Sequence, residues 1–129
     1  MELRTGLATR VQLTVTDADT AQALGSGDVP VLGTPRALAL AEAATVALTA
    51  GRLPAGSTTV GVRVELDHLL STPVGGLLVA EAVLSEVDGR RLAFVVTLRQ
   101  GDGDQVAARV RVDRMIVDRE KFVAKAYAG

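Results

Sequence analysis

The chain has 129 residues, of which 48% are hydrophobic but only 2% aromatic, and it contains no cysteine. This length predicts one domain, residues 1–129, whose core is built from valine, leucine and alanine. The 14 basic and 15 acidic side chains leave a net charge of −1, so no long-range field favours nucleic acid. The lack of cysteine excludes disulfides and thiolate metal sites.

The sequence shows no segment that would direct the chain to a membrane. Its first residues lack the basic start and apolar run of a signal peptide, and no apolar stretch reaches the roughly 18 residues of a membrane span. A single histidine without thiols gives no cluster with metal-ligand spacing. We therefore expect a cytoplasmic protein that needs no cofactor or metal and binds neither nucleic acid nor membranes.

The first part of the chain predicts a strand, a short helical turn and one long helix. Residues 8–16 alternate between apolar and polar side chains, as in a half-buried strand, and residues 17–24 predict a turn or a single helical turn. The long helix spans residues 34–50, with Thr34 as its N-cap, Pro35 in its first turn and Gly51 at its end. Because this helix is apolar nearly all round, we expect other elements to enclose it.

From residue 58 onwards the pattern predicts strands, at 58–68, 77–87, 92–98 and 106–112. Asp88-Gly89 predicts a hairpin, residues 101–104 predict another turn, and the tail from residue 118 is expected to be peripheral. Four successive antiparallel strands need a cover for one face, and the chain offers one long helix. The predicted fold class is therefore α+β, with an antiparallel sheet wrapped around one central helix.

His68, the only histidine, ends the face that strict alternation assigns to Val60, Val62, Val64 and Leu66. It can be a strand-end histidine that is hydrogen-bonded to a carbonyl. It can equally be a general base or orienting group, because imidazole titrates near neutral pH.

Glu42 and Thr34 also have two interpretations each. Glu42 is the only acid between Asp28 and Glu65, and lies either on a solvated stripe of the helix or in a site as a nucleophile or base. A buried carboxylate without a partner costs several kcal/mol, so a partner is expected. Thr34 is by default a cap, but a helix N-terminus can also polarise a carbonyl.

Thr34 and Glu42 are eight residues apart, which is about 12 Å along a helix. Two groups that far apart on one rigid helix do not ordinarily reach the same carbonyl. If both act on one ester or thioester, the simplest arrangement takes them from two chains of a symmetric dimer.

Several segments together resemble the hotdog-fold thioesterases of the fluoroacetyl-CoA thioesterase type. They are Val31-Leu32-Gly33-Thr34-Pro35-Arg36 with Glu42, Thr59-Val60-Gly61, Asp67 to Gly75 around His68, Glu86 to Arg91, and Val117 to Phe122. The resemblance implies a hotdog fold, a homodimer or higher oligomer, and acyl-CoA hydrolysis at sites between the chains. It also implies that Thr34, Glu42 and His68 drive attack on the thioester, directly or through water, and that Gly61 lies beside the thioester.

One segment departs from that family. The fluoroacetyl-CoA enzyme has an aromatic-rich segment before its threonine that gates the acyl pocket, whereas the equivalent residues 25–32 contain no aromatic side chain. We therefore expect a different, small or medium acyl group, carried by CoA or by a carrier protein. The alternatives are a non-catalytic acyl-CoA-binding or structural hotdog protein and an enoyl-thioester hydratase.

Overall fold

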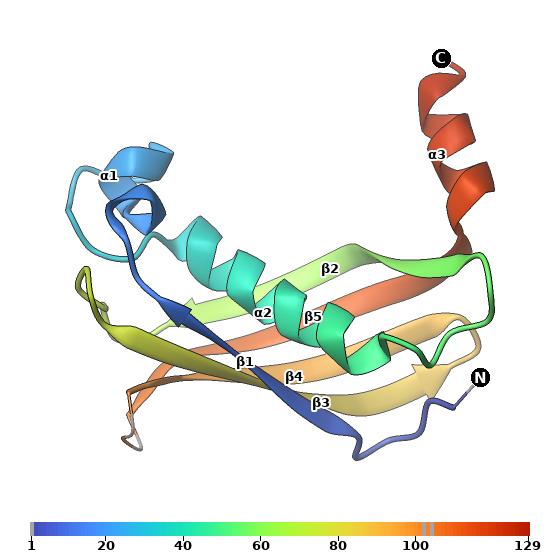
Figure 1. Ribbon diagram of the computed structural model, residues 1–129, viewed down its shortest axis with the longest axis horizontal. Helices are drawn as coiled ribbons and strands as arrows, with labels where there is room; N and C mark the ends of the chain where they lie inside the picture. The colour runs from blue at the N-terminus through green and yellow to red at the C-terminus, as the bar shows by residue number, and fades with distance from the viewer. Residues whose placement is uncertain (1, 102, 104) are drawn as a thin grey trace.

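The computed structural model describes residues 2–101, 103 and 105–129, and shows one antiparallel sheet with a long helix across it (Figure 1). The strands are β1 (Ala8–Thr14), β2 (Ser57–His68), β3 (Leu77–Asp88), β4 (Arg91–Gln100) and β5 (Val106–Asp118), in the order β1-β3-β4-β5-β2. The helices are α1 (Ala21–Leu24), which follows a 3-10 turn at Asp17–Asp19, α2 (Thr34–Thr49) and α3 (Arg119–Tyr127). The predicted α+β architecture is confirmed. Of the turn predicted at 101–104, Asp102 and Asp104 lie outside the described residues.

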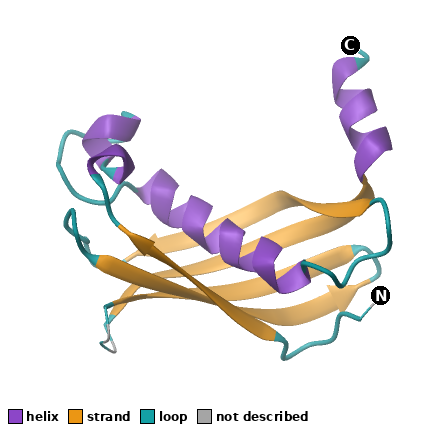
Figure 2. Ribbon diagram, in the orientation of Figure 1, coloured by secondary structure: helices purple, strands orange, loops and turns teal. Residues whose placement is uncertain are grey.

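Helix α2 covers the sheet with one side only (Figure 2). Its other side is open in the single chain, where Ala39 and Ala43 are exposed and Val46 is 49% exposed. The prediction that other elements enclose the whole helix is therefore wrong for one chain, because a single sheet can bury only one side of a helix. The buried side consists of Ala37, Leu40, Ala41, Ala44, Thr45, Leu48 and Thr49.

Strand β2 forms one edge of the sheet and carries a bulge. Gly61 pairs with Arg114 and Arg63 pairs with Asp113, so Val62 is the extra residue. The bulge reverses the alternation of side chains along the strand, and the prediction that Val60 shares the face of His68 is wrong. Instead Gly61 and His68 lie on the same face of the sheet, the one that α2 covers.

The tail forms a helix, α3, that the sequence pattern did not predict. Asp118 caps it, since its side chain accepts a 2.9 Å hydrogen bond from the backbone N–H of Lys121. All nine residues are exposed, and the helix rises from the end of β5 past β2 (Figure 1). Within the described residues, no helix is long and apolar enough to cross a membrane.

Candidate active site

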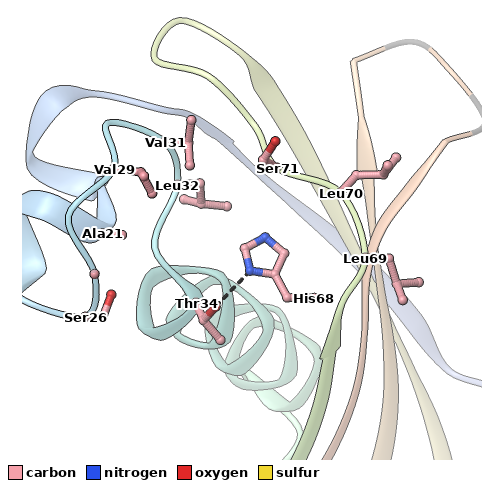
Figure 3. Close-up of a pocket in the computed structure, with 11 residues that line it drawn as sticks. Ala21, Ser26, Val29, Val31, Leu32, Thr34, His68, Leu69, Leu70 and Ser71 are labelled. Atoms are coloured by element: carbon pink, nitrogen blue, oxygen red, sulfur yellow. Dashed lines mark hydrogen bonds between the residues drawn. The ribbon is translucent and has the colours of Figure 1, made fainter.

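Thr34 and His68 meet where the start of α2 lies beside the end of β2. The Thr34 Oγ1 lies 2.8 Å from His68 Nδ1 (Figure 3). The predicted capping role of Thr34 is wrong, because Gly33 is the N-cap and its carbonyl accepts from the N–H groups of Arg36 and Ala37. The Thr34 hydroxyl is therefore free to bond the imidazole.

The Thr34–His68 pair lines an open pocket of about 390 Å³. The His68 Nε2 is buried, and no described group hydrogen-bonds to it. A buried ring nitrogen without a hydrogen-bond partner lowers the stability of the fold unless a ligand or a water molecule hydrogen-bonds to it. The other lining residues are mostly small or aliphatic: Ala21, Ser26, Gly27, Val29, Val31, Leu32, Leu69, Leu70 and Ser71.

An ion pair between Arg36 and Asp19 fixes the start of α2. The Arg36 Nε donates to the Asp19 carboxylate at 3.0 Å, and the Asp19 carbonyl accepts from the N–H of Gly33 at 3.0 Å. Burial alone would raise the pKa of Asp19, but hydrogen bonds from Thr16 and Arg36 and the charge of Arg36 lower it below its ordinary value. The ion pair thereby holds Thr34 in place next to His68.

Glu42 lies on the same helix but in a second cluster, where its expected partner is Arg114 on β5. The Glu42 Oε2 accepts from Arg114 Nη1 at 3.2 Å. Arg114 is only 8% exposed and also donates to Thr59, through Nε to the hydroxyl at 2.9 Å and through Nη2 to the carbonyl at 3.2 Å. These bonds fix the carboxylate of Glu42, whose side chain remains 36% exposed.

Gly61 lies directly against this carboxylate. A Cβ atom at Gly61 would be 2.6 Å from Glu42 Oε2 and 3.4 Å from Arg114 Nη1. The backbone of Gly61 is not in the left-handed region, so glycine is needed here for close approach rather than for conformation.

The structure thus brings Thr34 to His68, and Glu42 to Gly61, but leaves the two groups apart. Sequence reasoning missed Arg114, although a signal was present. Arg114 continues the buried apolar register of β5 that runs through Ala108, Val110 and Val112, and an arginine in such a register needs a buried partner.

The fold matches solved structures of hotdog thioesterases. The fluoroacetyl-CoA thioesterase FlK is 26% identical, with a TM-score of 0.89 over 98% of this chain and 96% of that chain. A variant of FlK in complex with fluoroacetate and CoA has a TM-score of 0.85, with 26% identity over 93% of this chain and 99% of the other. A thioesterase superfamily member from Thermus thermophilus is 24% identical, with a TM-score of 0.89 over 98% of this chain and 93% of that chain. No curated protein matches the chain.

The molecule is therefore a hotdog-fold thioesterase, an enzyme that hydrolyses thioesters. The model of the fluoroacetyl-CoA-specific thioesterase family matches residues 15–120, and the chain belongs to that family.

Proposed function

We propose that the enzyme hydrolyses a small or medium acyl-CoA at sites that two copies of the chain form together. Thr34 and His68 come from one copy, and Glu42 and Gly61 from the other. The observation that carries the proposal is the 2.8 Å contact between Thr34 and His68, which faces an open pocket, while Glu42 is anchored in a separate cluster.

The Thr34–His68 pair provides a base and a hydrogen-bonding group for the attack on the thioester. When Nδ1 accepts the Thr34 proton, the threonine oxygen becomes more nucleophilic and can attack the thioester carbonyl directly. Alternatively, the pair can activate a water molecule that attacks the carbonyl. The backbone N–H of Thr34 has no acceptor among the described residues, and it lies at the positive end of the α2 dipole. It is suited to stabilise the oxyanion that develops on the thioester carbonyl.

Within one chain, Glu42 and Gly61 lie apart from Thr34 and His68. Gly61 and His68 are seven residues apart on β2, about 23 Å along an extended strand. The free edge of β2 offers unpaired backbone groups to a second strand, and Val62 and Val64 beside it are 48% and 40% exposed. An antiparallel copy of β2, related by a two-fold axis, would place His68 opposite the partner copy's Gly61.

Glu42 then acts in the site of the partner copy. Arg114 holds Oε2, while Oε1 accepts no hydrogen bond from the described residues. This oxygen is available to take a proton from water or to orient it toward the thioester carbonyl. When water is the nucleophile, collapse of the tetrahedral intermediate breaks the C–S bond and releases the CoA thiolate and the acid. When Thr34 is the nucleophile, collapse releases the thiolate and leaves an acyl-threonine, which water then hydrolyses to the acid.

The proposed acyl group follows from the pocket. Apart from Thr34 and His68, its walls are mostly small or aliphatic and carry no Phe, Tyr or Trp, and its volume is about 390 Å³. A pocket of this size and character accommodates a small or medium acyl chain.

Release of free CoA from a panel of acyl-CoAs tests the proposal. Wild type is expected to release CoA, whereas Thr34→Ala, His68→Ala and Glu42→Gln each lose about a hundredfold or more in kcat. A thiol reagent gives a clean readout because the chain contains no cysteine. Wild-type rates in both Glu42→Gln and His68→Ala would contradict the assigned roles.

A further inference from the structure

We propose that helix α3 docks onto the partner subunit at the end of its strand β2, and forms one wall of the partner's acyl pocket. This inference rests on the two-chain site described above. It assigns an occupant to the exposed apolar face of a helix whose main contacts within the described chain are with β5.

Helix α3 has a distinct apolar face. Phe122 is 46% exposed, Val123 49% and Tyr127 88%. These residues and Ala126 stand at positions i, i+1, i+4 and i+5, which places them on one side of the helix. Lys121 lies on the opposite side. A short helix with two exposed aromatic side chains gains stability only if that face is covered.

A matching apolar patch lies just beyond the end of β2. Leu69 is 50% exposed, Leu70 38% and Val74 44%. In Figure 3, the side chains of Leu69 and Leu70 point away from Thr34, on the outer side of the segment that follows His68. The same segment lines the pocket, so whatever covers the patch also closes that side of the pocket.

The strand register connects the helix to the patch across the two chains. The pairing that sets His68 opposite the partner copy's Gly61 carries the Ser57 end of the partner copy's β2 beyond His68, next to the segment that follows that residue. Within each chain Ser57 pairs with Asp118, the residue directly before α3. In the pair of chains, α3 of one copy therefore begins beside the Leu69–Val74 segment of the other copy. Figure 1 shows that α3 extends beyond the β2 edge of the sheet.

Charge does not oppose this contact. The docking face of α3 offers Phe122, Val123 and Tyr127, and the patch offers only aliphatic side chains. Covering these groups removes apolar surface from water on both chains. It also brings aromatic side chains to a pocket whose own lining has none.

Cross-linking between two cysteine variants tests the docking, because the natural chain contains no cysteine. A Phe122→Cys chain is co-expressed with a Leu70→Cys chain and treated with a short thiol-reactive cross-linker. We expect covalent dimers in the mixture. The matched control, Lys121→Cys with Leu70→Cys, places its thiol on the far side of α3 and is expected to cross-link much less.

Equal cross-linking in both mixtures, or none in either, would overturn the docking of α3. Sedimentation of the wild-type protein separates this failure from failure of the proposed function. A fully active monomer would overturn both proposals, whereas an active dimer without the cross-link would overturn only this one. As a second measurement, Phe122→Ala is expected to raise KM several-fold with kcat nearly unchanged, and an unaltered KM would also contradict the docking.

Discussion

The approach of Gly61 to Glu42 is the tightest constraint among the site residues. The carboxylate occupies the space where a side chain at residue 61 would lie, and it is held there by Arg114. A glycine, an acid and a buried arginine from three separate elements therefore form one unit. These contacts fix the position of the Glu42 carboxylate.

Gly61→Ala is expected to lower kcat while leaving Tm nearly unchanged. The added methyl group would lie 2.6 Å from Glu42 Oε2, and the flexible end of the glutamate can move away at little cost. Displacing a catalytic group by about 1 Å can reduce the rate about a hundredfold. Steady-state kinetics and thermal melting measure both effects. Val60→Ala, one residue away on the opposite face, serves as the control, and equal kinetics in the two variants would refute the role of this contact.

Arg114→Met is expected to lower the free energy of unfolding by about 2 kcal/mol, because it removes charged hydrogen bonds to Glu42 and Thr59. Glu42→Gln in the same background is expected to cost less than it does alone, because the two side chains are coupled. Urea unfolding of the wild type, both single variants and the double variant measures this coupling. Strictly additive changes would show that the pair contributes nothing to stability.

At the scale of elements, the sequence predicts the regular strands and the long helix, but it does not predict the bulge in β2. The period of two in residues 58–68 predicts β2, but a bulge at Val62 leaves no mark in that pattern. The bulge nevertheless puts Gly61 on the face of His68. Likewise, Thr34 was expected to cap α2 because threonine favours that position, but its contact with His68 depends on tertiary structure.

The outer face of β4 and β5 carries a buried acid that predicts a pH dependence. Asp113 is 5% exposed and binds Arg91 at 2.9 Å and Arg111 at 3.1 Å. Burial alone would raise the pKa of Asp113, but the two arginines lower it below its ordinary value. A carboxyl with a lowered pKa in the folded state stabilises the fold above its unfolded pKa, near 3.8. That contribution to stability is lost as the pH falls through the pKa of Asp113 in the folded state.

Asp113→Asn is therefore expected to be less stable than wild type by about 2 kcal/mol at pH 7. This gap in the free energy of unfolding is expected to shrink as the pH falls below about 4. Urea unfolding at several pH values measures the gap. Glu65→Gln removes an exposed pair with Arg63 and should differ from wild type by at most about 0.5 kcal/mol. A gap for Asp113→Asn that stays constant down to pH 2 would contradict the assigned ion pairs.

At the scale of the whole molecule, the described chain holds two separate clusters of candidate site residues and several exposed surfaces. The helix spacing of Thr34 and Glu42 predicts that the two do not ordinarily reach one carbonyl within a chain. The structure adds that His68 joins Thr34, whereas Gly61 and Arg114 join Glu42. The edge of β2, the open side of α2 and the apolar face of α3 are the surfaces that a second copy can cover.

What the sequence could not predict at this scale was α3. Its nine residues mix four charged side chains with five apolar or aromatic ones and follow directly from a strand, so local pattern alone gives a weak signal. Its role depends on surfaces that come together only in an assembly. The fold class, in contrast, followed from one helix and four regularly alternating strands.

Mixed dimers test the two-chain site most directly. Glu42→Gln and His68→Ala are each expected to disable every site when expressed alone. When the two variants are co-expressed in equal amounts, half of the dimers contain one chain of each kind, and in those dimers one site carries both substitutions while the other carries none. The two-chain site predicts recovery of about a quarter of the wild-type rate of CoA release. Activity that stays at the level of the single variants would show that each chain builds its site alone.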